Sequence, residues 1–167
     1  MGELGWQWRR GAVIVGFFVD PILTISILVW IVYAVVSRLD TLVGDAKVTP
    51  HPVELFFVVP ILLCGIGQTL IHFWATKRLI QSTKKWREAR DATSMALFWR
   101  NVQATMSGLT LLLLLPIGFY LVLSKDTTAQ FGGMIPFFQK IVAAHAIAIM
   151  LRILCICVVQ KFIKELE

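Results

Sequence analysis

The sequence predicts an all-α integral membrane protein whose four transmembrane helices form an antiparallel bundle with both termini in the cytoplasm. Composition is the first of three observations behind this fold class: 57% of the 167 residues are hydrophobic, 16% are charged, and the mean hydropathy is +0.77. Soluble domains have roughly 45–50% apolar and 25% charged residues. A soluble chain of this length also buries only about two thirds of its surface. The apolar excess therefore requires a lipid environment, and it excludes disordered chains and small disulfide scaffolds.

Four long apolar stretches are the second observation, since a membrane-spanning helix needs about 20 mostly apolar residues. Their runs are continuous, which indicates helices, because the strands of a membrane barrel would alternate apolar and polar residues. Pro21, Pro60 and Pro116 lie inside these runs and predict local kinks, since proline cannot donate a helical hydrogen bond. The predicted spans, within a single domain of residues 1–167, cover approximately 11–36, 53–75, 102–123 and 136–159.

The distribution of basic residues is the third observation, and it predicts the orientation. The segment 76–101 carries seven basic residues against two acidic ones, and further basic residues lie near both termini. The predicted loops 37–52 and 124–135 carry only three basic residues between them. Because lysine and arginine favour the cytoplasmic side, both termini and the segment 76–101 are predicted to be cytoplasmic. The tryptophans expected at that membrane interface are Trp6, Trp8, Trp74 and Trp99.

Four polar residues, one from each predicted span, reach a similar depth in the membrane. At a rise of 1.5 Å per residue, each lies about 13–15 Å from the cytoplasmic end of its helix. Because charged groups are costly in hydrocarbon, Arg152 is expected to pair with Asp20 between the first and last helices. Such a layer most often holds helices together, and an ion path or a contact with another subunit are the alternatives. The predicted intramembrane polar layer consists of Asp20, Gln68, Thr110 and Arg152.

Two intramembrane histidines, His72 and His145, are candidates for a ligand or quinone contact. Counting along the helices separates them by roughly 17 Å along the membrane normal, which is too far for both to ligate one haem. A histidine hydrogen-bonded between helices is the favoured interpretation, with a single-ligand haem b or a quinone as the alternative. No group of residues has metal-ligand spacing, so neither a metal site nor a resident cofactor is expected.

The predicted cytoplasmic loop 76–101 interleaves basic side chains with apolar ones. A basic segment that carries tryptophan is expected to contact anionic lipid headgroups, and an ordinary loop obeying the positive-inside bias is the alternative. Nucleic acid is not an expected partner, because membrane topology already accounts for the positive charge. The residues expected at the membrane surface are Lys77, Arg78, Lys84, Lys85, Trp86, Arg87 and Arg90.

The sequence contains no nucleophile elbow, phosphate-binding loop, metalloprotease motif or carboxylate pair, so catalysis is not expected. The predicted function is that of a non-catalytic subunit of a larger membrane complex, of respiratory, secretion or translocation type, bound to other membrane subunits. One alternative is a small transporter or channel subunit that uses Asp20, Gln68, His72 and Arg152. The other is a quinone- or haem-binding anchor of an electron-transfer complex. Short loops and the lack of a glycosylation sequon favour the prokaryotic inner membrane, with an organelle membrane as the alternative.

Overall fold

The computed structural model describes residues 3–44, 52–85, 87–123 and 134–167, and almost all of them are helical. Side chains are described for residues 7–37, 59–85, 87–119 and 136–167. The helices in chain order are α1 (Glu3–Ile14), the π-helical turn η1 (Val15–Val19), α2 (Asp20–Gly44), α3 (Pro52–Lys84), α4 (Ala89–Leu123) and α6 (Met134–Leu166).

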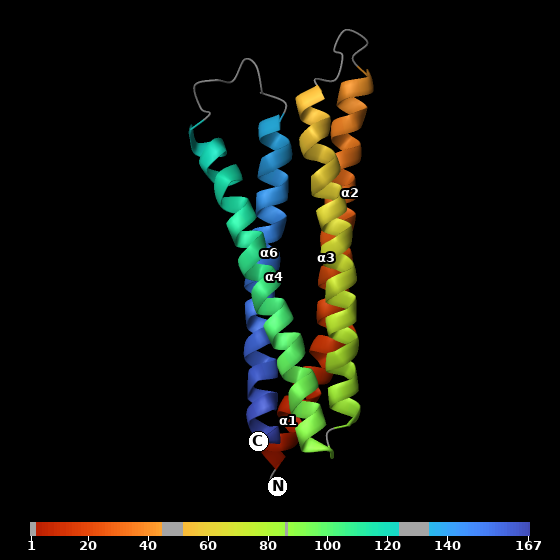
Figure 1. Ribbon diagram of the computed structural model, residues 1–167, viewed down its shortest axis with the longest axis vertical. Coiled ribbons are helices and arrows are strands. Elements are labelled where there is room, and N and C mark those ends of the chain that lie inside the picture. The colour runs from red at the N-terminus through yellow and green to blue at the C-terminus, as the bar shows by residue number, and fades with distance from the viewer. Residues whose placement is uncertain (1–2, 45–51, 86, 124–133) are drawn as a thin grey trace.

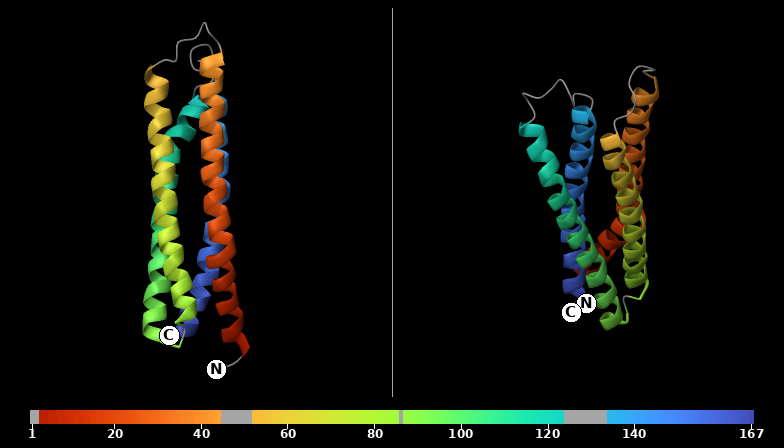
Figure 2. Two further views of the ribbon diagram at one scale, coloured as in Figure 1. Left: turned by 90° about the vertical axis from the view of Figure 1, so that its right-hand side faces the viewer. Right: turned by 45° about the horizontal axis from the view of Figure 1, so that its top comes forward.

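The helices form a bundle in which successive long helices run in opposite directions (Figure 1). Four helical units are long and apolar enough to cross a membrane, which confirms that part of the predicted fold class. The first unit is α1, η1 and α2 joined end to end, and the others are α3, α4 and α6. Both termini lie at the same end of the bundle (Figures 1 and 2). We call this the basal end and the opposite end distal.

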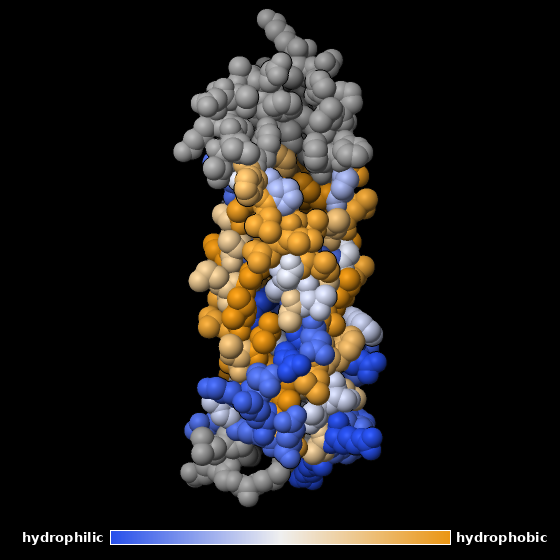
Figure 3. Space-filling model, turned by 60° about the vertical axis from the view of Figure 1, so that its left-hand side comes forward, coloured by the Kyte–Doolittle hydropathy of each residue, from blue (hydrophilic) through white to orange (hydrophobic). Residues whose placement is uncertain are grey.

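Surface hydropathy follows the long axis of the bundle. On the face drawn in Figure 3, hydrophilic residues gather toward the basal end and apolar residues form a broad band farther along. Large apolar side chains are exposed on the four helices, among them Phe18, Leu70, Leu112 and Met150. An apolar band of this kind is expected of a surface that contacts lipid tails.

The segment 76–101 is mostly helical, which corrects the prediction of a loop. α3 continues through Lys84 and α4 begins at Ala89, so only a short turn separates them. Leu79 and Ala96 are fully buried within the bundle. α3 and α4 contain 33 and 35 residues, so each is about 50 Å long, well beyond a hydrocarbon core of about 30 Å. The bundle core therefore extends farther than the apolar spans alone predicted.

A π-helical turn precedes the Asp20-Pro21 pair, where the sequence predicts a kink. The backbone N–H of Asp20 bonds to the carbonyl of Val15, five residues earlier, instead of four as in an α-helix. Pro21 then occupies the first turn of α2, where its missing N–H is tolerated. The wider turn shifts the helical register between α1 and α2, and Asp20 lies inside the bundle with 1% of its surface exposed.

Two apolar clusters fill the bundle on either side of its middle. The basal cluster joins residues of α1, η1, α3, α4 and α6, and the distal cluster joins residues of α2 and α6. Asp20, Thr24 and Arg152 are buried at the level between them. The basal cluster consists of Ala12, Val15, Ala75, Leu79, Ala96, Trp99, Cys155, Val159, Phe162 and Ile163. The distal cluster consists of Ile31, Ala34, Val35, Phe137, Phe138 and Ile141.

Gly11 lies where α1 packs against α6. A Cβ atom at this position would lie 2.8 Å from Cγ1 of Val158, which is closer than van der Waals contact allows. Valine has one strongly preferred rotamer in a helix, so Val158 cannot easily move away. We expect Gly11→Ala to lower the free energy of unfolding by about 1–3 kcal/mol, the usual range for overpacking.

Gly67→Ala is the matched control, because nothing lies within 4 Å of a Cβ atom built at Gly67. Alanine is favoured over glycine within a helix by about 0.5–1 kcal/mol, so this variant should be neutral or slightly more stable. Thermal unfolding of both variants in one detergent, followed by circular dichroism, measures the difference. Equal melting temperatures would show that α1 and α6 do not pack this closely.

Candidate functional site

The carboxylate of Asp20 collects hydrogen bonds from two other helices. Nε1 of Trp99 donates to its Oδ2 at 3.0 Å, and Nε2 of Gln103 donates to the same oxygen at 2.9 Å. The hydroxyl of Thr76 is the third donor to Oδ2. Asp20 is almost fully buried, so these three bonds replace the water that an exposed carboxylate would bind. The carboxylate thus ties the start of α2 to both α3 and α4.

Helical spacing brings the polar side chains to one place. His72 and Thr76 are four residues apart on α3, and Trp99, Gln103 and Ser107 follow the same spacing on α4. Residues four apart share one face of a helix, so each set points into the bundle. We define the polar centre as the following residues, each at least nine-tenths buried: Asp20, Thr24, His72, Thr76, Trp99, Gln103, Ser107 and Arg152.

Arg152 does not make the direct contact with Asp20 that the sequence predicts. The two charges lie within electrostatic range of each other. Between these two described side chains, however, no N–O distance falls within the 4.0 Å of a salt bridge. Three neutral donors already occupy Oδ2 of Asp20, and they compete with the guanidinium for the carboxylate. Both members of the predicted pair are therefore present at the centre but are not in contact.

Gln68 and Thr110 form a separate polar level on the distal side of Asp20. Nε2 of Gln68 donates to Oγ1 of Thr110 at 3.3 Å, and that hydroxyl donates to the backbone carbonyl of Met106 at 2.8 Å. No hydrogen bond between described side chains joins this pair to Asp20 or Arg152. The four residues that were predicted as one layer therefore lie at two levels.

The two histidines predicted to lie in the membrane have different surroundings. Nδ1 of His145 donates to the backbone carbonyl of Ile141 in its own helix at 2.8 Å. His72 is 1% exposed and lies beside the side chain of Gln103, although no hydrogen bond of standard geometry reaches either ring nitrogen from the described residues. Within the described ranges, no three histidine, cysteine or carboxylate side chains are placed to hold a metal ion. A haem or quinone contact would have to use His72 or Nε2 of His145.

The predicted lipid-binding residues surround the turn between α3 and α4 at the basal end. Nζ of Lys85 lies 3.4 Å from Oε2 of Glu88 in an exposed ion pair. The guanidinium of Arg78 lies 6.0 Å from the ring centroid of Trp74, at the outer limit of a cation–π contact. Trp86 lies outside the described residues. The remaining predicted residues, all exposed, are Lys77, Lys84, Arg87 and Arg90.

The tryptophans expected at the cytoplasmic interface divide into two kinds. Trp8 is partly exposed and has Nζ of Lys161 4.2 Å from its ring centroid, and Trp74 is exposed. Trp99 is fully buried inside the bundle instead of lying on its surface. Its indole N–H is satisfied by Asp20 inside the bundle, so it does not need interfacial water. The side chain of Trp6 lies outside the described side chains.

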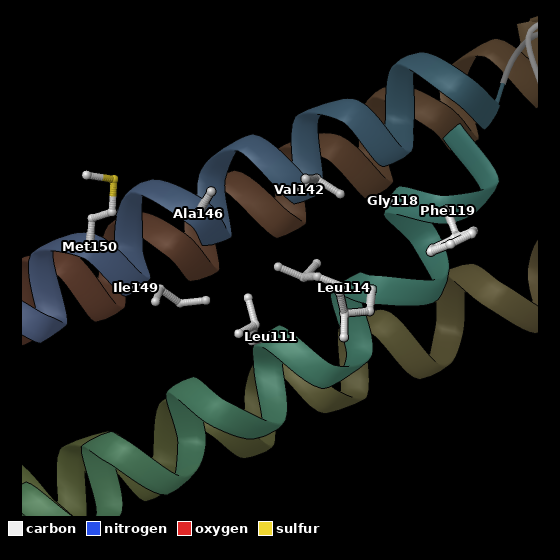
Figure 4. Close-up of a pocket in the computed structure, with 9 residues that line it drawn as sticks. Leu111, Leu114, Gly118, Phe119, Val142, Ala146, Ile149 and Met150 are labelled. Atoms are coloured by element: carbon white, nitrogen blue, oxygen red, sulfur yellow. The ribbon is translucent and has the colours of Figure 1, made fainter. Parts of the chain in front are cut away.

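An apolar groove of about 600 Å³ opens between α4 and α6. The two helices separate toward the distal end (Figures 1 and 2). Figure 4 shows Leu111 and Leu114 of α4 and Ile149 of α6 directed into the space between the helices. Two small residues, Gly118 and Ala146, also line this groove. The groove is a second candidate site, distinct in chemistry from the polar centre.

The three donors to Asp20 are not among the predicted site residues, although the sequence carries a signal for them. The four-residue spacing of Trp99, Gln103 and Ser107 marks one polar face of α4, and Thr76 extends the face of His72. Trp99 and Thr76 fall within the segment 76–101, which charge alone assigns to the cytoplasm. α3 and α4 are longer than their apolar runs, and this extra length places both side chains inside the bundle.

Comparisons of this chain with protein-family models, with curated proteins and with solved structures find no match.

Proposed function

We propose that this chain is a non-catalytic subunit of a larger membrane complex and that its α4–α6 groove receives an apolar helix of another subunit. The groove itself is the observation that carries the proposal, because apolar side chains line it along two helices that separate distally. Helices in lipid associate through close packing, and small residues let their backbones approach. Gly118 and Ala146 supply such positions on the two walls.

The polar centre supports the same proposal because its hydrogen bonds join helices. Thr76, Trp99 and Gln103 link α3 and α4 to Asp20 at the start of α2. The basal and distal apolar clusters lie on either side of it along the helices. This arrangement favours a stabilising role over the transporter alternative.

The positive-inside bias supports a cytoplasmic basal end. Its exposed basic residues would then lie beside the headgroups of anionic lipids, which attract such clusters. We propose the prokaryotic inner membrane as the location, with an organelle membrane as the alternative. Protease protection of a tag at either terminus in inverted and right-side-out vesicles measures the orientation directly.

Ala146→Trp is expected to abolish most partner binding, because the indole would fill the groove from the α6 wall. Ile147→Trp is the matched control, since it places the same side chain at the next position, which is 61% exposed and does not line the groove. Each tagged variant is purified from native membranes in mild detergent, and mass spectrometry measures the partners. We expect stoichiometric partner proteins to co-purify with the wild type and with Ile147→Trp. We expect these partners to be lost from Ala146→Trp.

Three outcomes would instead contradict the proposal. A wild-type chain that purifies alone, with only phospholipid bound, would show that lipid tails occupy the groove. Solute or ion transport by the pure chain in liposomes would favour the transporter alternative. A Soret band in the visible spectrum of the same sample would favour the haem-binding anchor.

A further inference from the structure

We propose that the polar centre binds ordered water molecules that bridge Asp20 and Arg152, so that the two charges form a water-separated ion pair inside the bundle. This inference does not depend on the function of the α4–α6 groove. It concerns residues at a different level of the bundle and a ligand of different chemistry.

Five residues of the polar centre carry polar atoms that have no hydrogen-bond partner among the described residues. They come from all four of the long helical units, and each side chain is at least nine-tenths buried. In native proteins roughly 90% or more of buried polar groups are hydrogen-bonded to protein or ordered water. Five such residues in one region therefore indicate a ligand. The atoms are Oγ1 of Thr24, Nδ1 and Nε2 of His72, Oε1 of Gln103, Oγ of Ser107 and Nε of Arg152.

Pairwise interactions and helical spacing place these residues at neighbouring levels of the bundle. Gln103 bonds to Asp20 through its amide nitrogen, and its side chain also lies beside His72, where its oxygen makes no hydrogen bond of standard geometry. Arg152 lies within electrostatic range of both Asp20 and His72. Thr24 stands one helical turn from Asp20, on the same face of α2. Ser107 stands one turn from Gln103 on α4 by the same spacing.

The unpartnered atoms include both donors and acceptors. Nε of Arg152 can only donate, and Oε1 of Gln103 can only accept. The hydroxyls of Thr24 and Ser107 can do both, and a neutral His72 offers one donor and one acceptor. The ligand must therefore be able to donate and accept hydrogen bonds at the same time.

Charge balance indicates that the ligand is neutral. Asp20 and Arg152 contribute one negative and one positive charge, which sum to zero. A bound anion or cation would leave a net charge in a region of low dielectric constant, where an unbalanced charge is strongly disfavoured. Water satisfies both requirements, and it lets Asp20 keep its three neutral donors while its charge still offsets that of Arg152.

The surroundings favour a small ligand. The basal and distal apolar clusters flank the centre along the helices. None of the five residues lines the three surface grooves defined by described side chains. One or a few waters, each making about three hydrogen bonds, fit a polar pocket of this kind.

Radiolytic hydroxyl-radical footprinting of the full chain in lipid nanodiscs tests this proposal, because X-rays generate radicals from water beside a side chain. We expect oxidation of His72 despite its burial, with incorporation of ¹⁸O after brief exposure to labelled water. Phe137 and Phe162 are the matched controls: they are equally buried, in the distal and basal clusters, and should remain unlabelled.

Water-edited solid-state NMR provides a second measurement, in which magnetisation from water should reach the His72 ring and Thr24 before it reaches these phenylalanines.

A variant that removes two of the unpartnered hydroxyls, Thr24→Val with Ser107→Ala, should reduce the labelling of His72 while the bundle stays folded. Wild-type His72 that is as inert as Phe137 in both measurements would overturn the proposal by showing a dry centre. Native mass spectrometry could instead detect a stoichiometric organic molecule on the wild type that is lost from this double variant. That result would also overturn the water proposal.

Discussion

Asp20→Ala is expected to lower the free energy of unfolding by about 3–5 kcal/mol, the range measured when one partner of a buried charged pair is removed. The substitution leaves Thr76, Trp99 and Gln103 with buried donors and no acceptor. It also leaves Arg152 as a buried charge with no counter-charge nearby. The charge contributes most of this effect, because individual hydrogen bonds within membranes average only about 0.6 kcal/mol.

Unfolding of the purified chain in detergent, monitored by circular dichroism, measures the effect of Asp20→Ala. Asp20→Asn separates its two causes, since an amide oxygen can still accept hydrogen bonds but carries no charge. Asp91→Ala is the control for loss of a carboxylate, because Asp91 is exposed at the start of α4. If Asp20→Ala were as stable as Asp91→Ala, the carboxylate would not organise the bundle.

Trp99→Ala is expected to have an effect of similar size, about 3–5 kcal/mol, because it removes a large, fully buried side chain from the basal cluster. It also removes a hydrogen bond to Asp20. Trp99→Phe keeps one aromatic ring but loses the N–H donor and the second ring of the indole. Its expected effect is therefore intermediate, about 1–3 kcal/mol, from the lost hydrogen bond and a partial cavity.

Trp74→Ala is the matched control, because Trp74 lies on an exposed surface and contacts Phe98 at 4.8 Å between ring centroids. Its expected effect is below about 1 kcal/mol, as for most surface substitutions. Tryptophan fluorescence of the single variants gives an independent readout, since loss of Trp99 removes a fully buried emitter. Equal destabilisation by Trp99→Ala and Trp74→Ala would contradict the buried position of Trp99.

Asp20→Ala and Trp99→Ala distinguish the contributions of polar and apolar contacts to the stability of the bundle around Asp20. Asp20 joins α2, α3 and α4 through hydrogen bonds, and Trp99 joins the basal cluster to the same carboxylate. The effects are not expected to add in the Asp20→Ala, Trp99→Ala double variant, because the side chains share a hydrogen bond. A double-mutant cycle measures this coupling, and exact additivity would show that the bond contributes nothing.

The rotation of each helix about its axis explains why the hydrogen-bond donors to Asp20 were not predicted from the sequence. Gln68, Thr110 and Arg152 were grouped with Asp20 because counting from charged residues gave them similar depths. Depth does not specify which way a side chain points around its helix. Gln68 and Thr110 meet each other, whereas Asp20 receives Thr76, Trp99 and Gln103. The rotation of each helix depends on how all four pack together.

Long apolar helices able to span a membrane were predictable from the amino-acid sequence, and an even number of them predicts both termini at one end. These properties follow from the length and hydrophobicity of each segment, which are local. Four features depend on packing between helices: the bundle extends through 76–101, Trp99 is buried, Asp20 and Arg152 do not touch, and α4 and α6 open a groove. Each of these depends on how helices cross and rotate against their neighbours, and on competition among several donors for one carboxylate.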